Sequence, residues 1–118
     1  MSAYRDPAKT GPNEILPNFY LGPHGSTFKK ATLQRLNIKY ILNMAGNSCK
    51  NKHPTSLFTY KTYYLADTKK QDIEMKVFQD TYRFIDNALN QGCGVAVHCM
   101  AGKPITKHIN KLYISLLC

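Results

Sequence analysis

The chain has 118 residues, of which 43% are hydrophobic and 19% are charged, and its net charge is +9. This length holds one domain with a modest core and excludes a second, and no apolar run approaches the ~18 residues of a membrane span. The positive charge favours anionic partners such as phosphorylated groups. The lysines are scattered rather than packed into one basic run, so we expect no nucleic-acid partner.

The cysteine content and the N-terminal residues indicate a reducing compartment. Four cysteines are too few for a disulfide scaffold, and they are Cys49, Cys93, Cys99 and Cys118. Residues 1–12 are polar and lack the apolar segment of a secretory signal. We therefore expect a flexible leader over 1–12 and a protein of the cytoplasm, with the nucleus as the alternative. The oligomeric state has no signal in the sequence.

The first half of the chain predicts two short strands, a helix and an internal strand. The extended segments 14–17 and 19–22 meet at Pro17 and Asn18, which is typical of a hairpin or bend at a sheet edge. A turn over 23–25 then precedes a helix from about residue 26 to 36, capped by Ser26 or Thr27. Its expected buried face consists of Phe28, Ala31 or Thr32, and Leu36. The apolar segment 38–44 predicts an internal strand, followed by a polar loop over 45–57.

The second half continues the alternation of strands and helices. Residues 59–65 are β-prone, and 67–71 form a polar loop. Apolar residues at intervals of three and four predict a helix from Asp72 to Asn90, ended by Gly92. A strand over 94–98 and a helix over 103–117 complete the order. This alternation predicts an α/β fold with a central, mostly parallel sheet flanked by helices.

The segment 94–102, Gly-Val-Ala-Val-His-Cys-Met-Ala-Gly, carries the strongest chemical signal. It predicts a buried strand that ends in a tight loop before a helix, an arrangement that holds anions against backbone N–H groups. A cysteine in such a loop has a lowered pKa and acts as a thiolate. The residues alone leave a second interpretation open, a buried strand that ends in a structural cysteine.

Three segments, 14–22, 36–43 and 84–102, resemble in this order the dual-specificity protein phosphatases, and the similarity covers about residues 12–102. The family loop reads His-Cys, five residues, Arg, then Ser or Thr. The resemblance implies that Cys99 is the nucleophile, which forms a phosphocysteine intermediate. It also implies that Asp67 is the general acid for the leaving group and that His98 helps to lower the thiol pKa. Asp72 matches a second acidic position, although a helix cap is the stronger interpretation there.

The same resemblance implies a substrate and a binding loop. The substrate is a phosphorylated protein, hydrolysed at phosphotyrosine and also at phosphoserine or phosphothreonine, and neither a metal nor an organic cofactor is required. The residues implied for the phosphate loop are His98, Met100, Ala101, Gly102, Lys103 and Thr106.

The chain departs from the family pattern directly after Gly102. Ile105 stands where the family has Arg, whose bidentate contact with the phosphoryl group tightens in the transition state. Two such charge-assisted hydrogen bonds contribute roughly 3–6 kcal/mol, or on the order of 10²–10⁴ in rate. Pro104 removes one N–H donor, and Lys103 offers a point charge without the planar fork of Arg. We expect weak or no phosphatase activity.

The family domain continues with further helices where this chain has only 103–118. We therefore expect residues 13–118 to form a C-terminally incomplete, partial domain. Since both departures begin after Gly102, one hypothesis is that intron sequence is translated beyond that codon, which the spliced transcript would test.

Other interpretations compete with an active phosphatase. A catalytically inactive domain that binds phosphoproteins would retain Cys99 and Asp67 without the arginine. A nucleotide-binding loop fails because it requires Gly at Val97 and Ser or Thr at Pro104. A zinc site of Cys93, His98, Cys99 and His108 has no familiar spacing. The remaining aromatic candidates are expected in ordinary roles, with His24, His53 and His108 on loops or the surface and Tyr60, Tyr63 and Tyr64 in a strand and the core.

Overall fold

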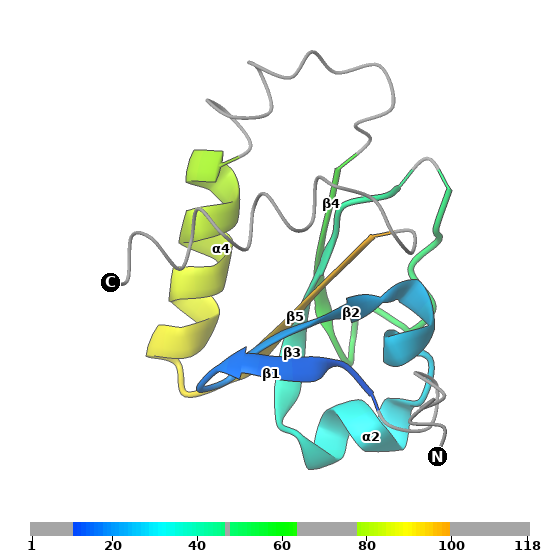
Figure 1. Cartoon of the computed structure of the whole chain (residues 1–118), viewed down its shortest axis with the longest axis horizontal. Helices are drawn as coiled ribbons and strands as arrows, with labels where there is room; N and C mark the ends of the chain where they lie inside the picture. Colours follow the sequence, from blue (N-terminus) through cyan, green and yellow to red (C-terminus); the bar gives the residue numbers. More distant parts are fainter. Residues whose placement is uncertain (1–10, 47, 64–77, 100–118) are drawn as a thin grey trace, which may run out of the picture.

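The computed structural model describes residues 11–46, 48–63 and 78–99 (Figure 1). In chain order the elements are β1 (Asn13–Leu16), β2 (Phe19–Pro23), the 3₁₀-helix η1 (His24–Thr27), α2 (Lys30–Arg35), β3 (Ile38–Asn43), β4 (Thr59–Thr62), α4 (Phe78–Asn90) and β5 (Gly94–Cys99). The five strands form one sheet in the order β1-β2-β5-β3-β4. The predicted α/β fold with a mostly parallel central sheet is confirmed.

Among the described strands, the sheet is antiparallel only at the pair that contains β1. β1 and β2 form an antiparallel hairpin at the edge, while β2–β5, β5–β3 and β3–β4 are all parallel pairs. Asn18 adopts a left-handed φ of 67° in the hairpin turn, a conformation that asparagine tolerates better than most residues. The hairpin predicted at Pro17-Asn18 is therefore confirmed, and β5 lies at the centre of the sheet.

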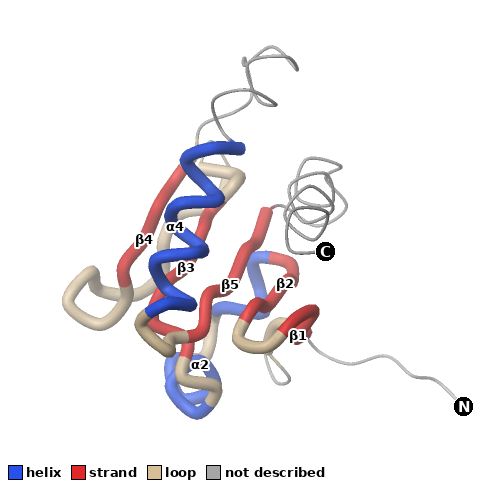
Figure 2. Tube along the Cα trace, turned by 90° about the vertical axis from the view of Figure 1, so that its left-hand side faces the viewer, coloured by secondary structure: helices blue, strands red, loops and turns tan. Residues whose placement is uncertain are grey.

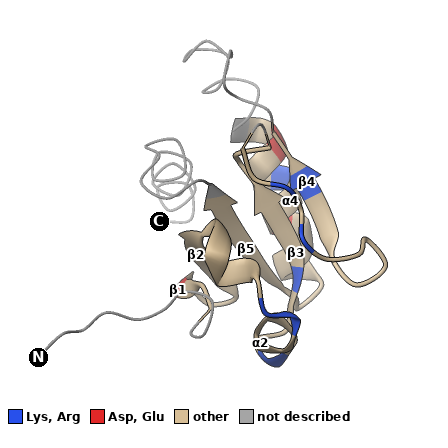
Figure 3. Cartoon of the chain, turned by 90° about the vertical axis from the view of Figure 1, so that its right-hand side faces the viewer, with Lys and Arg blue, Asp and Glu red and all other residues tan. Residues whose placement is uncertain are grey.

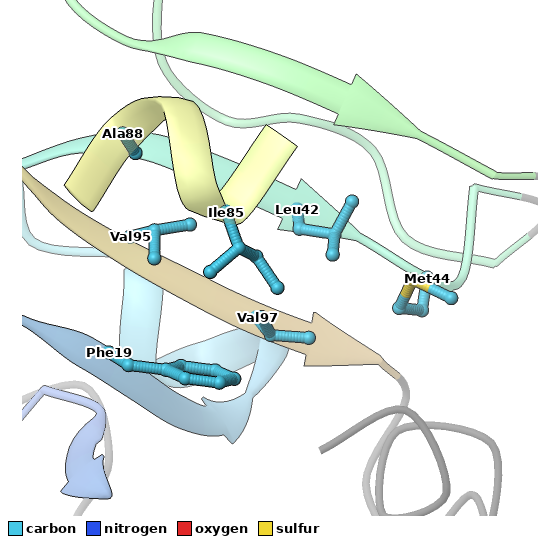
Figure 4. Close-up of a cluster of buried hydrophobic side chains, with 7 residues drawn as sticks. All are labelled: Phe19, Leu42, Met44, Ile85, Ala88, Val95 and Val97. Atoms are coloured by element: carbon cyan, nitrogen blue, oxygen red, sulfur yellow. The ribbon is translucent and has the colours of Figure 1, made fainter. Parts of the chain in front are cut away.

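The two faces of the sheet bury different side chains. On one face α4 contributes Ile85 and Ala88, which pack on five side chains of the sheet and its ends (Figure 4). Those five are Phe19, Leu42, Met44, Val95 and Val97. Figure 2 shows α4 lying along the sheet strands. On the other face, Leu33 of α2 and Phe58 pack with Tyr20, Ile38, Ile41 and Ala96.

The helix predicted from residue 26 to 36 divides into two shorter elements. The hydroxyls of Ser26 and Thr27 donate to the carbonyls of Pro23 and His24, three residues earlier, and thereby close the turn of η1. They do not cap α2, whose N-cap Lys29 has no side-chain cap bond. The predicted cap was wrong because α2 begins at Lys30, so Lys29 occupies the N-cap position and Ser26 and Thr27 belong to η1.

The predicted buried face of this helix was also partly wrong. Leu33 is fully buried and anchors α2, while Ala31 is exposed and Phe28 lies outside the helix with 36% of its surface exposed. Thr32 is buried and Leu36 is half-buried, as expected. After Leu36, Asn37 has a left-handed φ of 57° and donates its side-chain amide to the carbonyl of Gly92.

The end of α4 agrees with the sequence, whereas β4 is shorter than predicted. α4 ends at Asn90, and Gly92 follows with a φ of 74° that favours glycine. β4 ends at Thr62, three residues before the predicted end of that strand. Residues 1–10 of the predicted leader, the start of the helix at Asp72 and the helix predicted over 103–117 lie outside the described residues, whereas Gly11 and Pro12 are buried. Within the described part of the chain, no helix is long and apolar enough to cross a membrane.

Candidate functional site

The carboxyl ends of three neighbouring parallel strands meet beside His98. In the register of the sheet, His98 lies between Gly22 of β2 and Asn43 of β3, and the backbone of Cys99 pairs with Pro23. The His98 side chain is buried, with 1% of its surface exposed. Ligand sites of open α/β sheets lie at this carboxyl edge. The sheet therefore brings the His-Cys pair to the edge where a ligand is expected.

Asn43 organises the segment that follows β3. Its side chain is fully buried, and its amide donates to the carbonyl of Cys49 at 2.8 Å and to Oδ1 of Asn51 at 2.9 Å. Its own Oδ1 accepts the backbone N–H of Ala45 at 2.9 Å. The Asn43 side chain thus provides partners for two backbone groups of this loop, the carbonyl of Cys49 and the N–H of Ala45, which would otherwise lack a side-chain partner. The loop is fixed against the edge of the sheet.

Further hydrogen bonds tie this loop to β4 and η1. The Asn51 amide donates to Thr62 at 2.9 Å, and Nε2 of His53 lies 2.7 Å from the carbonyl of Thr27. The backbone N–H of His53 donates to the hydroxyl of Tyr60 at 3.1 Å. Burial raises the pKa of Tyr60, and this hydrogen bond acts in the opposite direction by favouring the phenolate. The polar loop predicted over 45–57 is therefore well anchored.

His24 begins η1 immediately after β2 and lies against His98. Their ring centroids are 4.9 Å apart with an interplanar angle of 23°, and Nε2 of His24 is 2.9 Å from the carbonyl of Lys50. Gly22 permits the sharp turn that places His24 there, since a Cβ at Gly22 would lie 2.5 Å from Oγ of Ser26 and 3.2 Å from Cα of Pro12. The turn therefore needs glycine for space.

The charges around this edge are mostly positive. Lys50 and Lys52 are exposed on the loop that Asn43 anchors, and the Lys52 ammonium lies 4.6 Å from the centre of the Phe28 ring. Lys61 of β4 pairs with Leu42 near the same end of the sheet, whereas the basic residues of α2 and Lys39 of β3 lie toward the amino ends of the strands (Figure 3). Such a surface attracts anions over roughly a Debye length of 8–10 Å.

The structure describes only part of the predicted site. His98 lies at the end of β5, and the backbone of Cys99 completes the same strand. The side chain of Cys99, the loop residues Met100 to Thr106 and Asp67 lie outside the described residues, so their implied roles stay predictions.

Two residues that organise this edge of the sheet, Asn43 and His24, were not identified from the sequence. Asn43 had a signal, since it is a polar residue that ends an apolar strand beside a predicted loop. His24 had no local signal: we expected a loop or surface histidine, but it is half-buried against His98. His53 is likewise half-buried and bonded to Thr27. Among the described residues, no three or more His, Cys, Asp or Glu side chains cluster as a metal site would require.

Comparisons with known proteins identify relatives of this sheet and edge. The family model described as dual specificity phosphatase, catalytic domain, matches residues 19–104. Dual specificity protein phosphatase 9 of Homo sapiens is 37% identical over 111 residues, which cover 89% of this chain and 29% of that protein. Dual specificity protein phosphatase 1-A of Xenopus laevis is 40% identical over 92 residues, covering 78% of this chain and 24% of that protein.

Solved structures agree with this similarity. A crystal structure of DUSP15 superposes with a TM-score of 0.76 at 25% identity, covering 92% of this chain and 67% of that one. The human tyrosine phosphatase-like serine/threonine/tyrosine-interacting protein gives a TM-score of 0.72 at 29% identity, covering 91% and 74%. The chain spans only about a quarter of the length of the curated relatives, 24% and 29% for the two named above. The family match covers most of this chain, which belongs to the dual specificity phosphatase catalytic-domain family.

Proposed function

We propose that the chain acts on phosphorylated protein side chains through the Cys99 thiol, as a phosphatase of low turnover. The observation that carries the proposal is the register of the sheet. It ends the central strand β5 in His98 and Cys99 at the carboxyl edge, between the ends of β2 and β3. The family match over residues 19–104 supports a phosphate monoester as the substrate class.

The proposed chemistry follows from the family and uses two steps. The Cys99 thiolate attacks phosphorus, so an S–P bond forms while the bond to the substrate oxygen breaks, and the Asp67 carboxyl gives its proton to that oxygen. Water then attacks the phosphocysteine and gives a proton to the Asp67 carboxylate. Cleavage of the S–P bond releases phosphate and restores the thiolate. Backbone N–H groups of the loop stabilise the charge on the phosphoryl oxygens.

The residue after Pro104 limits the proposed turnover. Ile105 has no group that can hydrogen-bond the phosphoryl oxygens, whereas the family has Arg at this position. Charge on the equatorial oxygens then has no bidentate cation beside it, and the loop offers backbone N–H groups and the point charge of Lys103 in its place. We expect a loss on the order of 10²–10⁴ in rate relative to a chain that has the arginine.

Release of phosphate from p-nitrophenyl phosphate tests the proposal. We expect slow release that disappears in Cys99→Ser and persists in the control Cys93→Ser, which replaces a buried thiol directly before β5. The double variant Pro104→Ser/Ile105→Arg should raise the rate at least about tenfold, because it restores an N–H donor and a bidentate cation. Release that is unchanged in Cys99→Ser would contradict the proposal.

A second candidate function is phosphoprotein binding without turnover. It is favoured by the retention of Cys99 and Asp67 in a chain that lacks the arginine. One solved relative also carries the name of a phosphatase-like, serine/threonine/tyrosine-interacting protein. Calorimetry with a phosphotyrosine peptide and its unphosphorylated form distinguishes the two. Selective binding of the phosphopeptide with no phosphate release favours this second function.

A further inference from the structure

The ring of His24 is packed directly on the ring of His98, the residue before Cys99. The two rings are stacked, with centroids 4.9 Å apart and an interplanar angle of 23°. The register accounts for this contact. Pro23, the last residue of β2, pairs with Cys99, so the chain leaves β2 at His24 beside the end of β5. The contact therefore joins two segments that are more than seventy positions apart in the sequence.

His24 is itself held by groups on other sides of its ring. Its Nε2 lies 2.9 Å from the carbonyl oxygen of Lys50, and the Phe28 ring meets it edge-on with centroids 4.9 Å apart. Because a carbonyl oxygen only accepts hydrogen bonds, Nε2 must carry a proton, which is true of one neutral tautomer and of the imidazolium. The hydroxyl of Thr27 donates to the His24 carbonyl and fixes the backbone. Both the ring and the backbone of His24 are therefore held in place by neighbouring groups.

We propose that His24 is a positioning residue for the Cys99 thiol, because its ring fixes the orientation of the buried His98 ring and thereby favours the thiolate. This inference rests on the proposed function, in which Cys99 attacks as a thiolate, and on the role in lowering the thiol pKa that the family resemblance implies for His98. Among the described residues, the titratable groups in contact with His24 or with the Phe28 ring beside it are the His98 ring on β5 and the Lys52 ammonium over Phe28, while Lys50 contributes its backbone carbonyl. Loss of the His24 ring removes the stacked contact that orients the His98 ring and thereby raises the pKa of the thiol.

Alkylation of Cys99 by iodoacetamide across a pH range, read by mass spectrometry of the Cys99 peptide, tests the inference on the full chain. The rate follows the thiolate fraction, so its midpoint reports the pKa of the thiol. In His24→Ala we expect the midpoint to move upward and the rate at about pH 6 to fall roughly threefold to tenfold, with little change at high pH. An unchanged midpoint would overturn the inference. A wild-type midpoint at the ordinary value of about 8.5 would also overturn it.

Two further variants separate the ring from the hydrogen bond. His24→Phe keeps a ring against His98 but cannot donate to Lys50, whereas His24→Gln keeps a donor without a ring. We expect His24→Phe to retain the wild-type midpoint, with an alkylation rate at about pH 6 within about twofold of the wild type. His24→Gln should behave like His24→Ala. The opposite ranking would show that His24 only anchors the loop, and would therefore overturn the inference even if His24→Ala unfolds.

His53 provides a matched control for these variants. It is also a half-buried histidine, with Nε2 near the carbonyl of Thr27 at 2.7 Å and its ring 5.1 Å from that of Phe58. Within the described residues, no hydrogen bond or ring contact joins His53 to His98, so His53→Ala should leave the Cys99 midpoint unchanged. The two proposals can also be contradicted independently of each other. Alkylation requires no turnover, and phosphate release that survives Cys99→Ser contradicts the catalytic proposal alone.

Discussion

The body of β5 and its carboxyl end are covered by different kinds of groups. Val95, Ala96 and Val97 lie between two apolar layers, with α4 on one face of the sheet and α2 with Phe58 on the other. At His98, by contrast, the group that packs on the strand is the His24 ring. Beside it, the Asn43 amide ties down the polar loop. One strand therefore passes from a hydrophobic core to a polar edge within a few residues.

This difference separates what stabilises the fold from what orders the edge. Apolar burial in the body is non-directional and contributes about 25 cal/mol for each Å² removed from water. The edge gains little from such burial, and its loops are held by directional bonds that satisfy buried backbone groups. Substitutions in the body should lower the stability of the whole domain, whereas substitutions at the edge should loosen the loops near His98.

The largest expected effect is in the body, at Ile85 of α4. The Ile85 side chain is fully buried between the helix and the sheet, so Ile85→Ala leaves a cavity and should lower the free energy of unfolding by about 2–5 kcal/mol. Urea unfolding followed by circular dichroism measures this loss. Arg83→Ala, at an exposed position of the same helix, is the control and should change stability by less than about 0.5 kcal/mol. Equal losses in the two variants would contradict the packing of α4 on the sheet.

A smaller effect is expected at the edge, where Asn43→Ala removes three hydrogen bonds at once. The buried carbonyl of Cys49 and the N–H of Ala45 lose their side-chain partner, which costs about 1–3 kcal/mol. Hydrogen exchange should rise mainly over residues 44–53, with less change in the body of β5. Asn51→Ala is the matched comparison.

The comparison with Asn51 tests whether burial decides the effect. Asn51 is exposed and belongs to the outer side of the same network, where it bonds Asn43 and Thr62. Because water can replace its partners, Asn51→Ala should cost less than about 1 kcal/mol and leave the 44–53 exchange pattern close to that of the wild type. If Asn51→Ala loosens the loop as much as Asn43→Ala, the buried amide is not the organising group.

Much of the body could be predicted from the sequence because its signals are local. Apolar residues of α4 recur at helical spacing, and the short apolar segments of β3 and β5 are bounded by polar or glycine residues. Pro17 and Asn18 similarly identified the edge hairpin. Each of these patterns depends on neighbours within one element, so it survives without knowledge of the fold.

The edge could be predicted only in part because its contacts depend on the register between strands. The place of His98 and Cys99 at a strand end followed from the sequence, but the neighbour of His98 did not. His24 reaches it only because Gly22 pairs with His98 across β2 and β5. The hydroxyls of Ser26 and Thr27 suit either a helix cap or a 3₁₀ turn. The 3₁₀ turn forms here because the chain turns closely where it leaves β2, at Gly22 and Pro23. Local patterns do not contain that information.

The smallest effect concerns Tyr63, which follows β4 and packs against the α4 face. Its hydroxyl is buried and has no hydrogen-bond partner among the described residues. Burial, and to a lesser extent the negative charge of Asp80, raises the pKa of Tyr63 above its ordinary value of 10.0. Since the folded state then holds the phenolic proton more tightly than the unfolded state, this contribution to stability is complete below about pH 10 and is lost as the pH rises further.

Tyr63→Phe removes this contribution without removing a hydrogen bond between described residues. We expect its stability at neutral pH to lie within about 0.5 kcal/mol of the wild type, and to fall less steeply between about pH 9 and 11. Tyr60→Phe is the contrasting variant. It takes away the acceptor of the His53 N–H, so it should already lose about 0.5–1.5 kcal/mol at neutral pH. Urea unfolding of both variants at several pH values measures these slopes. An alkaline slope in Tyr63→Phe as steep as that of the wild type would show that the Tyr63 phenol ionises as readily in the folded state as in the unfolded state.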